Sequence, residues 1–238
     1  MRLAMDEAMI RDAAEALAAR FKDLLVNYRR PIITMFGLVI ALNVANYTLL
    51  AYQPTYLQNT IDLSETSASV VNLIGQLVMM LLIPFFGWWS DSTGRKPMWW
   101  GSLIGLFVLA LPLYWLMGQG FAWAIVAFVI LGVLYIPQLA TISATFPAMF
   151  PTQVRYAGFA ISYNVATAAF GGTAPLVNDA VVESTDWNLF PAVYMMGACA
   201  IGMVALVFLK ETAGASLRGT EIPSLENDFT SLQKQKVN

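Results

Sequence analysis

Residues 87–97 read GWWSDSTGRKP and lie between two long apolar runs, at about 68–89 and 98–117. A helix that crosses the hydrocarbon core of a bilayer needs about 20 mostly apolar residues, and each run has that length. The polar stretch between the runs is long enough only for a turn. It therefore predicts two membrane-spanning helices joined by a tight connection, and the rest of the chain divides in the same way.

Five residues of this connection suggest a role beyond that of a turn. Asp91, at a helix end, can accept backbone hydrogen bonds from the N-terminus of a neighbouring helix. Gly94 permits a tight turn, and Gly87 lets a neighbouring helix approach closely. Arg95 and Lys96 supply positive charges that can pair and unpair as two helical bundles rock. We predict that these residues form a gate; an ordinary turn with basic residues is the simpler interpretation.

Further apolar runs complete a predicted bundle of six membrane helices. The composition agrees, because 58% of the residues are hydrophobic and only 12% are charged, against about 25% charged residues in an average soluble domain. A chain of 238 residues cannot hide that much apolar surface in a single core. We therefore predict an all-α membrane protein, with a tight hairpin at 118–120. The expected spans lie at about 32–52, 68–89, 98–117, 121–144, 156–178 and 190–209.

The charged residues sort by connection, which predicts how the bundle sits in the membrane. All 13 lysines and arginines lie before the first span, in the second or fourth connection, or after the last span. The first, third and fifth connections have no basic residue, and the first and fifth are acidic instead. Because basic loops stay on the cytoplasmic side, both termini are predicted to be cytoplasmic.

The two ends of the chain are predicted to lie outside the bundle, which occupies 31–210. Residues 1–30 combine charges with apolar residues at helical spacing, which predicts a cytoplasmic amphipathic or linker helix before the first span. A regulatory helix on the membrane surface is the alternative. Residues 211–238 are polar and are expected to form a mostly disordered cytoplasmic tail.

The composition disfavours several classes of function. The chain has no histidine and a single cysteine, Cys199, so disulfide frameworks, Cys/His metal sites and histidine-based nucleophile pairs are not expected. No acidic residue lies inside an expected span, which disfavours an intramembrane enzyme. The net charge of −2 disfavours a nucleic-acid partner. We predict neither an enzyme nor a cofactor or metal site.

Polar side chains inside the apolar spans are the candidates for a substrate site. Buried amides are costly in lipid unless they are paired, so they must face neighbouring helices or a cavity. A small zwitterion would suit such a cavity, because aromatic faces attract its cation and amides can bind its carboxylate. Hydrogen bonding between helices is the competing interpretation. The candidate substrate-binding residues are Asn43, Tyr47, Tyr52, Gln53, Tyr135, Gln138 and Asn164.

Prolines inside the spans predict bent or interrupted helices. Proline frees a backbone carbonyl and bends a helix, and Pro84, Pro112, Pro137 and Pro175 all lie in apolar runs. Gly171 and Gly172 precede the last of them, so this segment is a candidate gating hinge. The alternative is the general tolerance of proline in membrane helices.

The pattern G-x-x-x-D-x-x-G-R-K-P at 87–97 resembles the signature cytoplasmic loop of the major facilitator superfamily. Other segments are similar to the metabolite:proton symporters within that superfamily. They are 37–44 and 52–57, similar to the seventh helix; 147–156, similar to the connection between helices ten and eleven; and 210–212 and 218–219, similar to the segment after the last helix. The resemblance covers nearly all of residues 30–222.

The resemblance implies that the chain corresponds to helices seven to twelve of a twelve-helix transporter in a bacterial inner membrane. It implies proton symport of a small zwitterionic compatible solute, such as proline or glycine betaine, by alternating access. We predict that Arg155 anchors its connection either to the same gate or to lipid phosphates. The acidic proton-coupling residues are expected largely in an N-terminal six-helix partner. A truncated or non-transporting membrane subunit that needs a separate N-terminal half is the alternative.

Overall fold

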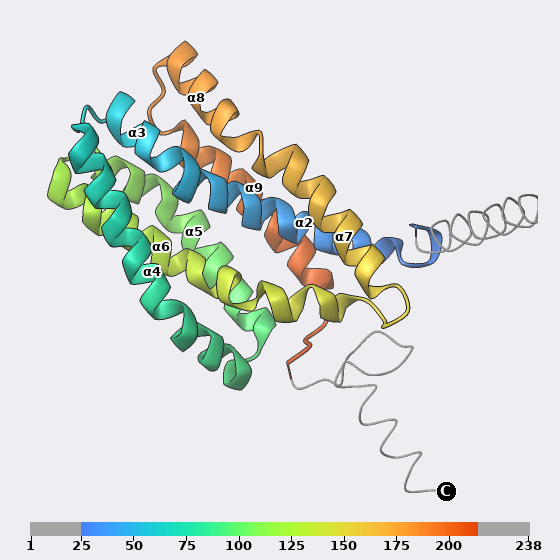
Figure 1. The fold of residues 1–238 in the computed structure, drawn as a ribbon. Helices are drawn as coiled ribbons and strands as arrows, with labels where there is room; N and C mark the ends of the chain where they lie inside the picture. The colour runs from blue at the N-terminus through green and yellow to red at the C-terminus, as the bar shows by residue number, and fades with distance from the viewer. Residues whose placement is uncertain (1–24, 214–238) are drawn as a thin grey trace, which may run out of the picture.

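The computed structural model describes residues 25–213, and every regular element among them is helical. The helices form six spans that are long and apolar enough to cross a membrane and that run up and down in one bundle (Figure 1). The predicted all-α, six-helix architecture is therefore confirmed. The elements are α2 (Arg29–Asn46), η1 (Tyr47–Tyr52), α3 (Gln53–Asn59), α4 (Glu65–Thr93), α5 (Arg95–Met117), α6 (Phe121–Thr145), η2 (Pro147–Met149), α7 (Arg155–Ala166), η3 (Thr167–Gly171), α8 (Ala174–Thr185) and α9 (Phe190–Phe208).

Two of the spans change helix type part of the way across. α2 continues through the π-helical segment η1 into α3, and α7 continues through the π-helical segment η3 towards α8. Pro54 and Pro175 lie in the first turns of α3 and α8, where the missing N–H has no intrahelical partner to lose. The helices therefore resume, and both spans are longer than expected. As a result Asp179 and Glu183 lie on α8, whereas the sequence placed them in a connection.

Three prolines that were expected to interrupt helices do not do so. Pro84, Pro112 and Pro137 lie inside α4, α5 and α6, which run past them without a break. Neighbouring helices and local adjustments accommodate such prolines in membrane helices. Only Pro175 coincides with a break, and there a π-helical segment and two glycines come first.

α2 is the central helix of the bundle. The span that contains it is 72% buried over its most apolar window, against 22% for α4 and 22% for the α7–α8 span. α2 packs against α9 and α7, α9 packs against α5, and α6 packs against both α5 and α4. α4 and the α7–α8 span therefore form opposite flanks of the bundle (Figure 1).

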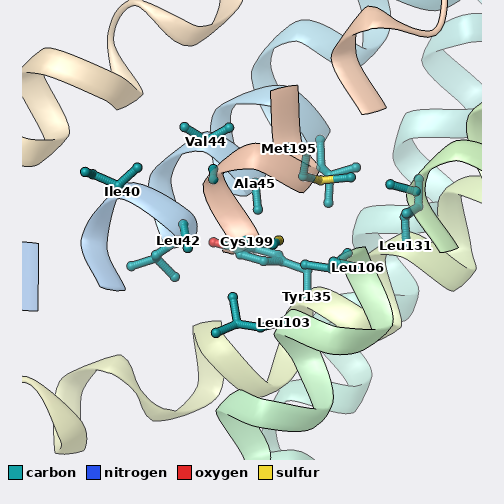
Figure 2. Packing of buried hydrophobic residues seen from close by; sticks show 14 of the residues in the cluster. Ile40, Leu42, Val44, Ala45, Leu103, Leu106, Leu131, Tyr135, Met195 and Cys199 are labelled. Atoms are coloured by element: carbon teal, nitrogen blue, oxygen red, sulfur yellow. The ribbon is translucent and has the colours of Figure 1, made fainter. Parts of the chain in front are cut away.

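Apolar side chains from α2, α5, α6 and α9 fill the centre of the bundle (Figure 2). Tyr135 of α6 and Cys199 of α9 are fully buried there, in one cluster with Leu103, Leu106 and Ala45. Lipid tails are as apolar as these side chains, so the cluster stabilises the bundle by close packing rather than by exclusion of water.

Small residues let α2 and α9 approach closely. A Cβ at Gly202 would lie 2.6 Å from the Cβ of Ala41, and one at Gly37 would lie 2.7 Å from the Cβ of Ala205. Both neighbours are atoms fixed to the helix backbone, so they cannot rotate away. The two helices therefore require glycine at these positions.

We expect Gly202→Ala to lower the free energy of unfolding by about 1–3 kcal/mol, because the added methyl overpacks a rigid contact. Gly197→Ala on the same helix is the control, since no atom lies within 4 Å of its added Cβ. Far-UV circular dichroism of the purified chain, titrated with sodium dodecyl sulfate in mixed micelles, measures both. Equal transition midpoints for the two variants would contradict the close approach.

The two ends of the bundle differ in charge. We call the end with the α4–α5 and α6–α7 connections the basic end, and the opposite one the acidic end (Figure 1). Asp91 and Glu211 are the described acids at the basic end. Which end faces the cytoplasm stays a prediction. The described basic residues at the basic end are Arg29, Arg30, Arg95, Lys96, Arg155 and Lys210, and the acids at the other end are Asp62, Glu65, Asp179, Glu183 and Asp186.

Candidate functional site

Hydrogen-bonded polar side chains connect α2 to η3 and to α6 inside the bundle. Asn43 of α2 donates from Nδ2 to Oγ1 of Thr167 at 2.9 Å, and also to the carbonyl of Val39 at 3.1 Å. Asn46 donates from Nδ2 to the hydroxyl of Tyr135 on α6 at 2.7 Å. Residues three apart share a helix face, so both amides lie on one side of α2. The set Asn43, Asn46, Tyr47, Tyr135 and Thr167 is called the polar cluster below.

Two residues of the polar cluster lie at the starts of the two π-helical segments. Tyr47 begins η1 and Thr167 begins η3, directly after the α-helical parts of their spans. The N–H of Gly172 bonds to the carbonyl of Thr167 at 2.9 Å, the i to i+5 pattern of a π-helix. Across the pair, Asn178 Nδ2 of α8 donates to Thr48 Oγ1 at 3.1 Å. Single-turn π segments occur frequently at functional sites.

One side of the polar cluster is open. Asn46, Tyr47 and Thr167 are partly exposed, and Asn164, one turn before Thr167, is exposed. The span Arg155–Thr185 has the lowest mean hydropathy of the six, 1.2, although only 22% of that window is buried. Amides and hydroxyls that face hydrocarbon are costly. A water-filled cavity or a further protein surface therefore suits this face better than lipid does.

Some hydrogen-bond donors and acceptors of the polar cluster have no partner within residues 25–213 and could bind a solute. Both amide protons of Asn43 are used, so its Oδ1 remains as an acceptor. Thr167 and Tyr135 accept bonds from the two asparagines, and within residues 25–213 their own hydroxyl protons have no acceptor. Tyr47 adds an aromatic ring. Donors, an acceptor and an aromatic face together can bind the carboxylate and the cationic group of a small zwitterion.

Two of the predicted substrate residues lie in a separate group near the acidic end. Gln53 is fully buried, donates from Nε2 to Sδ of Met117 at 3.1 Å and accepts from the hydroxyl of Tyr114 at 3.3 Å. Tyr52 is also buried, with its ring 6.2 Å from that of Tyr56. The bonds of Gln53 tie α3 to α5, which fits the interhelical interpretation of that residue. The ring contact of Tyr52 is with the next turn of its own span.

The remaining two predicted residues, Gln138 and Asn164, have no hydrogen bond to the polar cluster. Gln138 is fully buried between α6 and α5, where its Nε2 donates to Oγ of Ser102 at 2.8 Å. Its Oε1 is buried without a hydrogen-bond partner among the described residues. Asn164 lies on the exposed side of α7. The structure therefore brings together Asn43, Tyr47 and Tyr135, places Asn164 one turn from Thr167, and leaves Gln138 apart.

Asn46 and Thr167 hold the cluster together, although neither is among the predicted substrate-binding residues. Asn46 could have been found from its spacing, since it shares a helix face with Asn43. The bond from Asn43 to Thr167 joins positions 124 residues apart. The sequence around each residue does not predict a hydrogen-bond partner at that separation.

At the basic end, Glu211 caps the N-terminus of α5. Its Oε1 accepts from the N–H of Arg95 at 3.1 Å, and its Oε2 accepts from the N–H of Lys96 at 2.9 Å. The N–H groups of Thr212 and Ala213 also bond to Oε1, both at 2.9 Å. A carboxylate satisfies the unpaired N–H groups of a helix start and complements its partial positive charge.

Arg95 and Lys96 cap two further helix ends. Nη1 of Arg95 donates to the carbonyl of Ala144, near the end of α6, at 2.9 Å. Nζ of Lys96 donates to the carbonyl of Leu209, just after α9, at 2.6 Å. Cations are favoured at helix C-termini. Arg95, Lys96 and Glu211, called the basic-end clamp below, thus join the ends of α5, α6 and α9.

The basic-end clamp depends on the charge of the Glu211 carboxyl. Partial burial opposes ionisation of Glu211, but the backbone N–H bonds from Ala213, Lys96, Arg95 and Thr212 outweigh it and lower the pKa of this carboxyl below its usual value. Glu211 is therefore ionised at neutral pH and holds the clamp as a carboxylate.

The clamp bears on two expectations about the basic end. Glu211 is the acceptor at the α5 N-terminus. The side chain of Asp91 is exposed and has no hydrogen bond within residues 25–213, so its pairing with the N-terminus of a neighbouring helix stays a prediction. Residues 211–213 pack against the bundle, so they do not belong to the predicted tail. The rest of that tail and most of the predicted N-terminal helix lie outside the described residues.

The other predicted gating residues are Gly94, Gly87 and Arg155. Gly94 has a φ of +100°, so the tight turn requires glycine there. A Cβ on Gly87 would have no atom of the described residues within 4 Å, so a close approach at Gly87 stays a prediction for another partner. Arg155 donates from Nε to the carbonyl of Phe150 at 3.1 Å and so braces its own connection.

Comparison with known proteins finds one matching family model and several similar transporters. The family model described as Major Facilitator Superfamily matches residues 8–175. The ectoine/proline transporter of Corynebacterium glutamicum is 36% identical over 207 residues, which cover 86% of this chain and 40% of that relative. The proline/betaine transporter of Escherichia coli K12 is 34% identical over 200 residues, covering 84% and 40%. The glycine betaine/proline/ectoine/pipecolic acid transporter of Dickeya dadantii is 31% identical over 204 residues, covering 84% and 40%. The chain thus spans about 40% of the length of these relatives.

Proposed function

This chain belongs to the major facilitator superfamily, and from that premise we propose that it forms the C-terminal six-helix half of a secondary active transporter. The solute is a small zwitterion such as proline or glycine betaine, and transport is coupled to protons by alternating access. The N-terminal half is a second six-helix bundle, in the same polypeptide or in another chain. The basic end of the bundle faces the cytoplasm of a bacterial inner membrane.

The open side of the polar cluster carries this proposal. Partly exposed amides and hydroxyls lie on α2 and on the least apolar span, where lipid cannot satisfy them. A second bundle placed against this side would enclose a polar cavity between two halves, which is where transporters of this architecture bind their solutes. The curated relatives, of which the chain covers 40%, have ample length for such a bundle.

The free groups of the cluster suit the proposed solutes. The hydroxyl of Thr167, which is partly exposed, donates to the solute carboxylate, and Oδ1 of Asn43 accepts from the N–H groups of proline. The buried hydroxyl of Tyr135 holds Asn46 in place beside them. The ring of Tyr47 faces the methylated ammonium of glycine betaine, which has no N–H to donate. Asn164, on the exposed side of α7, lies towards the second half. The basic-end clamp holds the three helix ends that move as one body when the cytoplasmic side opens.

Uptake with divided halves tests the proposal. Cells without their own proline and betaine uptake express this chain, the part of the Escherichia coli relative that lies outside the match, or both, and radiolabelled solute is measured at raised osmolality. We expect accumulation only when both are present, and its loss with a proton uncoupler. The relative's own two parts, expressed separately, are the positive control.

Each other result has a distinct meaning. Uptake by this chain alone would contradict its role as a half. No uptake with both parts, when the positive control accumulates solute and this chain is present in the membrane, would favour a non-transporting subunit and overturn the proposal.

A further inference from the structure

We propose that Gly171 sets the position of Tyr47 and Asn43 and thereby limits the size of the solute that the polar cluster accepts. This inference rests on the function proposed above, because it assigns a role within the same site. Gly171 is a positioning residue in this proposal: it touches the two side chains and not the solute.

The contact between Gly171 and the polar cluster is tight. A Cβ on Gly171 would lie 2.7 Å from Cε2 and 3.0 Å from Cδ2 of Tyr47, and 3.3 Å from Cβ of Asn43. Carbon atoms are in favourable contact at about 3.5–4.0 Å, so the tyrosine ring lies directly on the glycine backbone. The ring can occupy this position only because residue 171 has no side chain.

Hydrogen bonds on either side fix the backbone around this contact. Asn43 is held by Thr167, which lies on η3 four residues before Gly171. Thr48, next to Tyr47, is fully buried and is held by Asn178 at 3.1 Å. The two helices are therefore pinned to each other on both sides of the Tyr47 ring. If a side chain at position 171 occupies the space where the Tyr47 ring now lies, these hydrogen bonds keep the two helices from moving apart.

The direction in which the ring can yield follows from the burial of its neighbours. Residues 48 and 49 are buried, whereas Tyr47 itself is partly exposed towards the open side of the polar cluster. A methyl at position 171 would therefore push the ring outwards, into the space where the solute is proposed to bind. A smaller site would discriminate against a larger solute more than against a smaller one.

Proline and pipecolic acid form a suitable pair of probes, because they differ by one ring methylene and share the same charged groups. One methylene in a fitted pocket changes discrimination by about 10–200-fold. We expect Gly171→Ala to lower the ratio of pipecolic acid uptake to proline uptake by about tenfold, in cells that express the full chain together with the N-terminal part.

Gly172→Ala is the matched control, because the nearest atom to its added Cβ is the carbonyl oxygen of Ala168 at 3.4 Å, an ordinary contact. The ratio is expected to stay at the parent value in this variant. Tyr47→Trp enlarges the ring without changing Gly171, and it covers the case in which Gly171→Ala does not fold. It is expected to lower the ratio in the same direction.

A second readout separates this inference from the proposed function. 3-Fluorotyrosine at position 47 of the purified full chain reports the ring's surroundings by ¹⁹F NMR without any transport. We expect the ¹⁹F chemical shift of this residue to change in Gly171→Ala and to remain at the parent value in Gly172→Ala. Adding Tyr47→Leu to Gly171→Ala removes the displaced ring and is expected to return the uptake ratio towards the parent value.

The outcomes are distinguishable. Equal losses of proline and pipecolic acid uptake in Gly171→Ala and Tyr47→Trp, with a moved resonance, would overturn the size-limiting role and leave the transporter proposal intact. An unmoved resonance would overturn the contact itself. If the parent pair takes up neither solute, the proposed function fails and the role of Gly171 in solute size fails with it.

Discussion

Replacing Glu211 with alanine is expected to lower the free energy of unfolding by about 2 kcal/mol. Glu211 accepts the N–H groups of Arg95 and Lys96 at the start of α5 and two more from its own turn. Loss of a helix-capping acceptor costs about 0.5–2 kcal/mol, and hydrogen bonds to a charged group lie towards the upper end of that range. The variant also loosens the backbone of Arg95 and Lys96, whose side chains cap α6 and α9.

Detergent-titrated unfolding of the full chain measures this loss, and hydrogen exchange locates it. We expect faster exchange at the amides of Arg95 and Lys96 in Glu211→Ala. Asp91→Ala is the matched control, because it removes another carboxylate from the basic end, one with no hydrogen bond within residues 25–213. If the two variants unfold at the same detergent fraction, Glu211 does not act as a cap of α5.

The lowered pKa of Glu211 gives the clamp a defined pH dependence. A carboxyl whose pKa is lower in the folded state stabilises the fold fully above its unfolded value, about 4.3 for glutamate. That contribution is lost as the pH falls through the lowered folded value. The difference in stability between the parent and Glu211→Gln should therefore be constant from about pH 8 to pH 5 and shrink below about pH 4.

The architecture could be predicted because lipid imposes strong constraints on sequence. Every span needs about 20 apolar residues, and the basic residues of the connections sort to one side. The hairpin at 118–120 follows from two glycines between apolar runs, and Gly120 indeed has a φ of +120°. Helix ends were less certain. Nothing in residues 47–52 or 167–171 marks them as π-helical, so the lengths of those two spans were underestimated.

The partners of individual polar residues could not be predicted. Glu211 caps α5 across 116 positions, and Gln53 meets Tyr114 across 61. Such pairs depend on how helices are ordered around the bundle, which hydropathy does not encode. A polar residue in an apolar run predicts only that a partner exists. That is why Asn43 and Gln138 looked alike in the sequence, although one lies beside an open surface and the other is sealed between two helices.

Replacing Tyr135 with alanine is expected to lower the free energy of unfolding by about 3–5 kcal/mol, the usual cost of deleting a fully buried aromatic ring. Tyr135 is completely buried at the centre of the bundle, in one cluster with Cys199, Leu103 and Leu106 (Figure 2). The same detergent titration measures the loss. A smaller change, below about 1 kcal/mol, would mean that the neighbouring helices close the cavity and that the packing around this ring is not rigid.

Tyr135→Phe separates packing from chemistry at the same position. It keeps the ring and removes the hydroxyl that accepts from Asn46 at 2.7 Å. An interhelical hydrogen bond in a membrane contributes on average about 0.6 kcal/mol, so we expect a small loss of stability. If the hydroxyl also donates to the solute carboxylate, uptake should fall by about tenfold or more, because hydrogen bonds to charged groups contribute about 1.5–3 kcal/mol.

Tyr114→Phe is the matched control for this variant. Tyr114 is also a buried tyrosine with one side-chain hydrogen bond, to Gln53 at 3.3 Å, but it lies outside the polar cluster. Both variants should lose similar stability, and only Tyr135→Phe should lose uptake. Unchanged uptake in Tyr135→Phe would remove this hydroxyl from the solute site and leave it an interhelical bond. Loss of uptake in both would point to a general demand for stability, because both tyrosines are buried and hydrogen-bonded but only Tyr135 is bonded to a residue of the polar cluster, Asn46.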